Sequence, residues 1–161
     1  MRTGGGADGR TGGPPQTTPS THQPVLPAEG RLLAIDWGEK HIGLAITDPL
    51  RIIAQPLATL TRRAGRRFPL RQLRPYLDEY APVGIVVGLP LTPDGTEGPS
   101  AAAAREVASL VAAKTGLPVV LHDERMTTAR AARADAVGGR VDRDQRAASI
   151  LLQAYLETHR Q

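Results

Sequence analysis

The chain has 161 residues, a length that fits one domain of ordinary size with a substantial hydrophobic core. It contains no cysteine, which excludes disulfide bonds, thiolate metal sites and cysteine nucleophiles. The 20 Lys and Arg residues outnumber the 16 Asp and Glu residues, and this net charge of +4 favours a polyanionic partner. No apolar stretch approaches the length of a membrane span, and the polar N-terminus lacks the apolar segment of a secretory signal, so we expect a cytoplasmic protein with no membrane partner.

Residues 1–30 differ in composition from the rest of the chain. They hold seven Gly and five Pro, and Val25 and Leu26 are their only bulky aliphatic residues. Such a segment buries too little apolar surface to offset the entropy cost of ordering it. We therefore expect a disordered tail over residues 1–30 and one folded domain over residues 31–161.

The first part of the expected domain reads as three antiparallel strands. Apolar stretches at 31–37 and 41–48 are separated by three residues, which is close enough for a hairpin. A third apolar stretch at 52–60 contains Pro56. Because proline cannot donate a hydrogen bond to a strand ladder, Pro56 favours an edge position or a bulge.

The second part alternates helices and strands. Leucines at helical spacing predict a first helix, with Pro69 in its first turn and a kink at Pro75. Continuously apolar runs predict buried strands, and runs with one apolar face predict further helices. In chain order we expect a helix over 70–80, a strand over 84–91, a helix over 99–114, a strand over 117–124, and helices over 127–137 and 144–157. This order predicts an α/β domain whose later strands are parallel.

Carboxylates follow two of the predicted strands. Asp36 ends the first strand, and Asp123 and Glu124 end the last one. Ligands of α/β sheets bind in the crevice beyond the carboxyl ends of strands, so these side chains are candidate ligands. A turn-forming role for Asp36, and simple solvation of the strand end by Asp123 and Glu124, are the structural alternatives.

Helix phase distinguishes Asp144 from Asp142. The residues on the same helical face as Asp144 are Ala147, Ala148, Leu151 and Tyr155. The residues that share a face with Asp142 are polar, so Asp144 is expected to point toward the sheet and Asp142 away from it. An N-cap role is the structural alternative for Asp144. Three acids at the ends of elements suit Mg²⁺ or Mn²⁺, which prefer oxygen ligands.

Four segments of the chain carry a more specific pattern. They are LLAIDWGEKHIGLAITDPL at 32–50, IVVGLPLTPDGTEGP at 85–99, HDERMTT at 122–128 and DQRAASILLQAYL at 144–156. Together they resemble the YqgF/RuvX family of RNase H-like nucleases, described as Holliday junction resolvases and as pre-16S rRNA nucleases.

The resemblance implies an RNase H-like α/β fold, with a five-stranded mixed sheet, an antiparallel meander of the first three strands, and helices on both faces. It also implies that Asp36, Glu124 and Asp144 are the catalytic and metal-binding residues. Two residues depart from the family pattern. Trp37 stands where Tyr, Phe or Val is usual, and His41 replaces a common Arg, which would remove a phosphate contact or make it pH-dependent.

The resulting hypothesis is metal-assisted hydrolysis of a phosphodiester bond. Asp36 would bridge two divalent ions, Mg²⁺ or Mn²⁺, between Glu124 and Asp144, and two such ions stand about 3.5–4 Å apart in two-metal nucleases. The expected substrate is a pre-16S rRNA precursor, and a branched DNA junction cut by a homodimer is the alternative. A catalytically silent nucleic-acid adaptor is less favoured because all three acids are present. An actin-like ATPase would need a second domain, for which the chain is too short.

Basic and loop residues near these acids are the candidate contacts to nucleic acid. The set is Lys40, Arg62, Arg63, Thr96, Arg125 and Arg143. An exposed turn residue is an equal alternative for Lys40, and Arg125 could instead neutralise a neighbouring carboxylate. The roles of His41, Glu97 and Asp123 stay open. With one Trp, three Tyr and one Phe, the chain has too few aromatic residues for base stacking to dominate, so we expect recognition of backbone and shape.

Overall fold

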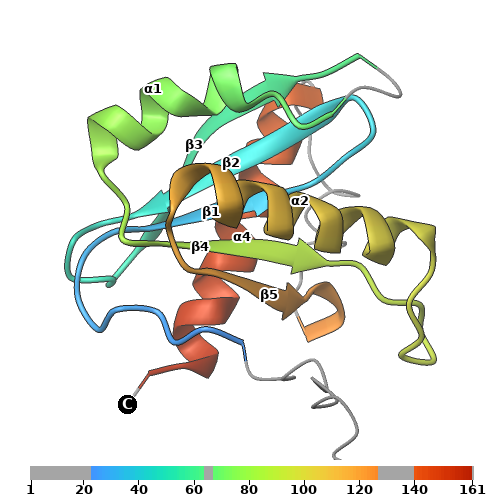
Figure 1. Cartoon of the computed structure of the whole chain (residues 1–161). Coiled ribbons are helices and arrows are strands. Elements are labelled where there is room, and N and C mark those ends of the chain that lie inside the picture. Colours follow the sequence, from blue (N-terminus) through green and yellow to red (C-terminus); the bar gives the residue numbers. More distant parts are fainter. Residues whose placement is uncertain (1–22, 64–66, 127–139, 161) are drawn as a thin grey trace, which may run out of the picture.

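Five strands and three α-helices make up the part of the chain that the structure, a computed structural model, describes: residues 23–63, 67–126 and 140–160 (Figure 1). In chain order the elements are β1 (Leu32–Asp36), β2 (His41–Thr47), β3 (Ala54–Thr61), α1 (Leu70–Tyr80), β4 (Gly84–Leu89), α2 (Pro99–Thr115), β5 (Val119–Asp123), the short 3-10 helix η1 (Glu124–Met126) and α4 (Arg140–Thr158). The helix predicted over 127–137 lies outside the described residues. Each of the other predicted elements is present close to its expected place.

The strands form one mixed sheet in the order β3-β2-β1-β4-β5. β2 pairs antiparallel with both β1 and β3, whereas β4 pairs parallel with both β1 and β5. The predicted meander and the predicted parallel strands are therefore confirmed. Because β1, β4 and β5 run in one direction, their last residues lie at the same end of the sheet, together with the start of β2 and the end of β3. We call this the carboxyl end, and it is formed by Asp36, His41, Thr61, Leu89 and Asp123.

Pro56 occupies the kind of position that a proline in a sheet requires. β3 is an edge strand, and its pairing with β2 shifts between Leu44, which faces Ala58, and Ala45, which faces Pro56. Leu57 is the extra residue of this bulge. Both the edge position and the bulge follow from the missing proline N–H, and both are confirmed.

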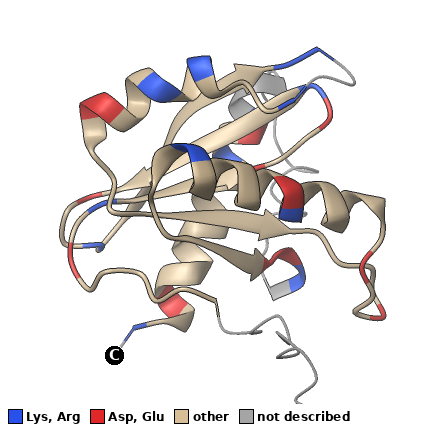
Figure 2. Cartoon of the chain, in the orientation of Figure 1, with Lys and Arg blue, Asp and Glu red and all other residues tan. Residues whose placement is uncertain are grey.

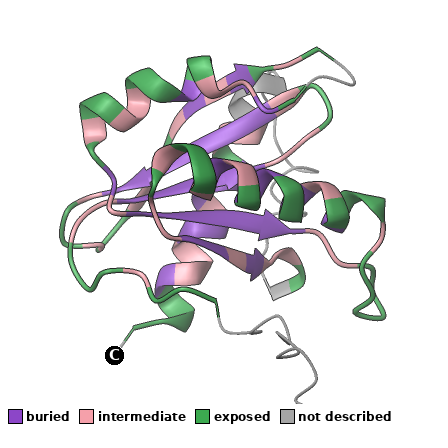
Figure 3. Cartoon of the chain, in the orientation of Figure 1, coloured by how far each residue is buried: buried purple, intermediate pink, exposed green. Residues whose placement is uncertain are grey.

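The sheet has a hydrophobic core on each face, and its strands are buried between helices whose outer surfaces are exposed (Figure 3). Leu33 and Ile35 of β1 belong to the core under α1 and α2, whereas Leu32 and Ala34 belong to the core under α4. Successive strand side chains point to opposite faces, so Asp36 continues the series of Leu32 and Ala34. The Asp36 side chain therefore lies on the face that α4 covers.

Helices α1 and α2 agree with the sequence patterns. Pro99 is the first residue of α2, and Gly116 ends this helix with a left-handed φ of 72° while its N–H donates to the carbonyl oxygen of Ala112 at 3.0 Å. Pro69 caps α1 rather than standing inside it. The helix continues across Pro75 to Tyr80.

Helix α4 begins earlier than expected. It starts at Arg140, so Asp144 lies in its second turn, and both the expected start at Asp144 and the N-cap alternative for this residue are wrong. No Gly or Pro stands between Arg140 and Asp144 to end a helical backbone. Ala147 and Ala148, on the face predicted to be inward, are fully buried against the sheet.

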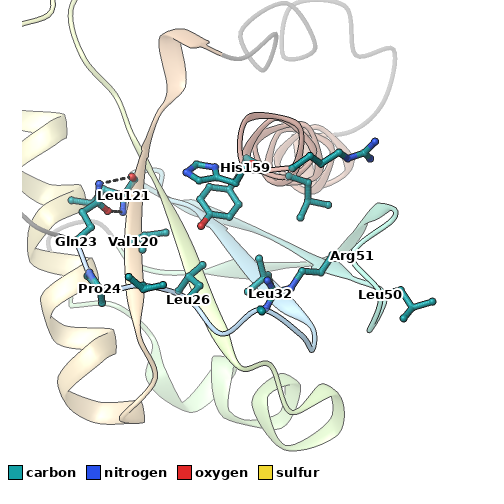
Figure 4. Close-up of a pocket in the computed structure, with 14 residues that line it drawn as sticks. Gln23, Pro24, Leu26, Leu32, Leu50, Arg51, Val120, Leu121 and His159 are labelled. Carbon is teal, nitrogen blue, oxygen red and sulfur yellow. Dashed lines mark hydrogen bonds between the residues drawn. The ribbon is translucent and has the colours of Figure 1, made fainter.

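Residues 23–30 lead into β1 without forming a helix or strand. The Gln23 side chain bonds both backbone groups of Leu121 on the edge strand β5, because its Nε2 donates to the Leu121 carbonyl at 3.2 Å and its Oε1 accepts from the Leu121 N–H (Figure 4). Leu26 packs beside Gly84 at the margin of the core under α4. The remainder of the segment assigned to a tail, residues 1–22, lies outside the described part.

The turn between β2 and β3 lies at the opposite end of the sheet from Asp36. One oxygen of Asp48 accepts the N–H groups of Ile52 and Ile53, both at 2.8 Å, and the other accepts the N–H of Leu50 at 3.2 Å. These hydrogen bonds lower the pKa of the Asp48 carboxyl, and the bond from Ile53 has the largest effect.

Within the described ranges, none of the helices combines the length and the hydropathy that crossing a membrane requires.

Candidate active site at the carboxyl end of the sheet

Asp36 has a glycine beside it on each of the two neighbouring strands. It ends β1, is only 4% exposed, and stands opposite Gly43 of β2. On its other side, the parallel pairing of Ile35 with Val87 leads to Gly88 of β4. Neighbouring strands are about 4.8 Å apart, so the two glycines leave space directly beside the Asp36 carboxylate.

Glu124 fills the space over Gly88. A Cβ atom built on Gly88 would lie 2.4 Å from Oε1 of Glu124 and 3.1 Å from its Cδ. Val86, two residues earlier on β4, belongs to the core under α4, so Gly88 faces the same side of the sheet as Asp36. Although Glu124 follows β5 as the first residue of η1, its carboxyl group therefore reaches the strand next to β1.

Asp144 lies over the other glycine. A Cβ atom on Gly43 would be 2.0 Å from the backbone oxygen of Asp144, so the second turn of α4 rests directly on β2. Asp144 and Asp36 line one cavity of about 390 Å³. The other residues around it are Trp37, Gly38, Glu39, Lys40, His41 and Arg143. The fold thus brings three acids, which are distant in the sequence, to one face of the carboxyl end.

The donor chemistry of this group fits a hard divalent cation. All three side chains offer carboxylate oxygens, and the glycines let Glu124 and the Asp144 backbone come close to the strands beside Asp36. In the described part of the chain, however, no three His, Asp or Glu side chains stand close enough together to hold one metal ion. Asp36 and Asp144 line one cavity, and Glu124 lies over Gly88 outside the residues that line it.

Arg125 is held by Asp123 and by the loop after β4. Its Nη2 lies 2.9 Å from Oδ2 of Asp123, and its backbone N–H donates to Oδ1 at 2.9 Å. These hydrogen bonds lower the pKa of the Asp123 carboxyl. Nη1 reaches the carbonyl oxygen of Pro93 at 3.4 Å. Of the alternatives for Arg125, neutralisation of a neighbouring carboxylate is thus present, and Asp123 is the residue it neutralises.

The loop after β4 uses its polar side chains internally. Asp94 accepts hydrogen bonds from the hydroxyl of Thr92 and from the hydroxyl and N–H of Thr96, and these bonds lower the Asp94 pKa to about 2. The Thr96 hydroxyl is therefore engaged within the loop. Glu97 forms an ion pair with Arg105 of α2, in which Nε lies 2.8 Å from Oε1, and it does not line the cavity of Asp36.

Two of the remaining basic candidates, Lys40 and Arg143, lie close to Asp36 and Asp144. Lys40 is exposed in the turn between β1 and β2, and it lines the cavity of Asp36 together with His41 and Arg143. Nε of Arg143 and Nδ1 of His41 are both buried, and neither has a hydrogen-bond partner among the described residues. Arg63 is exposed just beyond β3, outside this cavity.

Trp37 is a site residue whose contacts the sequence did not reveal. The guanidinium of Arg62 lies over the indole ring, with Cζ 4.1 Å from the ring centroid, and its Nε donates to the carbonyl oxygen of Gly38 at 3.3 Å. Phe68 stacks on the indole with the centroids 6.0 Å apart. The sequence signal was an aromatic residue directly after Asp36, but its partners come from elements that only the fold brings near.

A further cavity, of about 690 Å³, lies beside residues 23–28 and α4 (Figure 4). Leu26, Leu32 and Val120 give it apolar walls, and Arg51 and His159 stand at its margin. None of the predicted site residues lines it, and neither does any Asp or Glu of the described ranges. The carboxyl end of the sheet is therefore the better candidate for an active site.

Comparison with known proteins agrees with this geometry. The RuvX family, described as Holliday junction resolvase, matches residues 30–158. A Dictyoglomus thermophilum protein named "Putative pre-16S rRNA nuclease" is 39% identical over 134 residues, which are 80% of this chain and 96% of that protein. A Streptomyces coelicolor protein of the same name is 42% identical over an alignment 155 residues long, which covers 89% of this chain and 91% of that protein.

A solved structure supports the fold. RuvC of T. thermophilus in complex with a Holliday junction substrate aligns with a TM-score of 0.51 at 16% identity, over 81% of this chain and 96% of that one. The expected five-stranded RNase H-like architecture, with helices on both faces, is therefore confirmed. Taken with the match over residues 30–158, these findings show that the chain belongs to the RuvX family.

Proposed function

We propose that this chain is a divalent-metal-dependent endonuclease that hydrolyses phosphodiester bonds, and that its substrate is a precursor of 16S rRNA. The observation that carries the proposal is the common position of Asp36, Glu124 and Asp144 beside Gly43 and Gly88. Relatives that match this chain over nearly their whole length are named as nucleases of that RNA, which supports the choice of substrate.

The three carboxylates have distinct positions from which to act. Asp36 is buried in the middle, Glu124 approaches from the side of β4, and Asp144 approaches from α4. They would hold one or two Mg²⁺ or Mn²⁺ ions, which when bound supply an activated water and neutralise charge on the phosphate oxygens. Three carboxylates alone repel a phosphate, and Lys40 and Arg143, which line the same cavity, offset this repulsion.

Resolution of branched DNA is the second candidate function. The description of the RuvX family names it, and the structural neighbour RuvC is bound to a Holliday junction. A symmetric junction calls for two active sites, and hence for a dimer of this chain. A silent nucleic-acid adaptor is disfavoured because the acids that hydrolysis needs are all present.

The experiment compares cleavage of a pre-16S rRNA leader with cleavage of a synthetic four-way DNA junction, in Mg²⁺ and in Mn²⁺. We expect the RNA to be cut. Each of the variants Asp36→Asn, Glu124→Gln and Asp144→Asn should lower the cleavage rate more than about a hundredfold. Mutation of residues that only support metal ligands already lowers metal affinity or activity about 10–100-fold. Asp78→Asn, an exposed carboxylate at the far end of α1, is the matched control and retains its rate.

Two outcomes contradict the proposal in different ways. Cleavage of the junction without cleavage of the RNA would favour the resolvase. Full activity of Asp36→Asn in Mn²⁺ would mean that the active site lies elsewhere. Titration of Mn²⁺ into the wild type and into the three variants gives a readout that does not depend on substrate, since each variant should bind the ion more weakly.

A further inference from the structure

Four arginines line one pocket where β3 leads into α1. They are Arg62, Arg63, Arg67 and Arg71, and we call this cavity of about 730 Å³ the arginine pocket. Thr61, Pro69 and Gln72 complete the described part of its wall. No Asp or Glu is among the described residues that line it.

The walls of the arginine pocket are fixed by hydrogen bonds and stacking. The Gln72 side chain clamps the end of β3 to the first turn of α1, because its Nε2 donates to the Thr61 carbonyl at 2.7 Å and its Oε1 accepts from the Thr61 N–H at 3.2 Å. The guanidinium of Arg62 lies over the Trp37 ring. Two wall residues, Arg62 and Gln72, are therefore held in place by contacts with other parts of the fold.

The electrostatics of the arginine pocket are unfavourable without an anion. Four arginines line one cavity, and within the described ranges Arg63, Arg67 and Arg71 are exposed and form no ion pair with a carboxylate. Helix α1 adds to the positive potential, because its first turn has no acidic residue while Asp78 and Glu79 stand near its C-terminus (Figure 2). This is the reverse of the charge order that a helix dipole favours.

A further cavity shares wall residues with both the arginine pocket and the candidate active site. Trp37 lines the cavity of Asp36 and also a second cavity of about 410 Å³. Arg62 and Arg67 line this second cavity and the arginine pocket. One carboxylate, Glu106 of α2, belongs to the second cavity. A chain of phosphates that leaves the cavity of Asp36 can therefore pass over the Trp37–Arg62 stack into the arginine pocket.

We infer that the arginine pocket is a second binding site for the phosphodiester backbone of the nucleic-acid substrate, beyond the phosphate that is hydrolysed. Guanidinium groups bind phosphate oxygens through paired N–H donors, and such contacts position a strand without reading its bases. RNA and DNA offer the same backbone chemistry. The inference rests on the proposed nuclease function only for the identity of the substrate, and binding is testable without cleavage.

The experiment measures binding in EDTA, where hydrolysis cannot proceed, with labelled RNA and DNA duplexes at several salt concentrations. The test variant is Arg63→Gln/Arg67→Gln. The control Arg74→Gln/Arg160→Gln removes the same charge from exposed arginines outside the three adjacent cavities. Loss of two phosphate contacts should weaken binding of the DNA duplex about 60-fold at 0.1 M salt and reduce the log–log salt slope by about 1.8. The control should change both far less.

Stability and kinetics distinguish this role from a purely structural one. Without nucleic acid, the test variant should melt at the same temperature as the wild type or above it, because repulsion is relieved. In Mg²⁺ it should raise KM for the RNA leader and leave kcat near the wild-type value.

Two results would overturn the inference: equal losses of affinity in both double variants, or a lower melting temperature of the test variant. Strong duplex binding by a wild type that cleaves nothing would instead refute the proposed nuclease function and leave this inference intact.

Discussion

The two ends of the central sheet use their polar residues in opposite ways. At the turn between β2 and β3, the buried Thr47 hydroxyl accepts the N–H of Leu32, Asp48 accepts three N–H groups, and Arg51 donates to the carbonyl oxygens of Pro27 and Gly30. At the carboxyl end, acids and arginines instead line adjacent cavities. The first arrangement stabilises the chain, and the second places charged groups around hollows of the surface, as binding sites do.

Replacing Gly43 should have the largest effect, since this residue both supports the packing of α4 on the sheet and lies beside the candidate active site. In Gly43→Ala the new Cβ meets the backbone of Asp144 at 2.0 Å, and a helix backbone cannot move aside cheaply. We expect the free energy of unfolding to fall by about 1–3 kcal/mol, as for other overpacked sites, and cleavage to be lost with it. Urea denaturation measures the first effect. Gly98→Ala is the control, because a Cβ there has nothing within 4 Å.

Replacing Gly88 should separate activity from stability. In Gly88→Ala the Cβ meets the end of the flexible Glu124 side chain, which can rotate away. We therefore expect the free energy of unfolding to stay within about 0.5 kcal/mol of the wild type, while the cleavage rate of the RNA leader falls about 10- to 100-fold. A Gly88→Ala variant that cleaves at the wild-type rate would show that the position of Glu124 over Gly88 does not matter for catalysis.

The smallest effect is expected at the other end of the sheet. Asp48→Asn keeps the shape of the side chain but weakens the three hydrogen bonds that it accepts, so the melting temperature should fall slightly at pH 7 while cleavage is unchanged. Because folding lowers the pKa of Asp48, its stabilisation is complete above the ordinary aspartate pKa of about 3.9 and is lost as the pH falls through the lowered value. The difference between variant and wild type should therefore vanish in strong acid, and a constant difference would contradict this account.

Local chemistry explains why much of the fold was predictable. Pro99 and Gly116 mark both ends of α2, and Pro56 identifies an edge strand with a bulge. Each of these signals acts through the backbone of the residue itself. Asp144 shows the limit of such reasoning. Its helical face follows from spacing within the helix, but the start of α4 at Arg140 does not, because the largely polar residues 140–143 carry no apolar pattern that would extend the helix back to Gly139.

The parts of the site that the sequence did not predict depend on contacts between distant residues. Trp37 directly follows β1 and Arg62 directly follows β3, and their contact depends on the pairing of β2 with both strands. Arg125 had two plausible partners in the sequence, and the geometry of η1 selects Asp123. The acids Asp36, Glu124 and Asp144 could be selected as candidates from the sequence, whereas the glycines that make room for them required the register of the sheet.

The contact between Gln23 and Leu121 has a consequence for self-association. β5 ends the sheet on one side, and an exposed edge strand is a template on which another chain can extend the sheet and aggregate. By occupying both the N–H and the carbonyl oxygen of Leu121, the Gln23 carboxamide takes the place that a sixth strand would need at that residue. A short segment ahead of the first strand thus blocks the addition of another strand at this point of the edge.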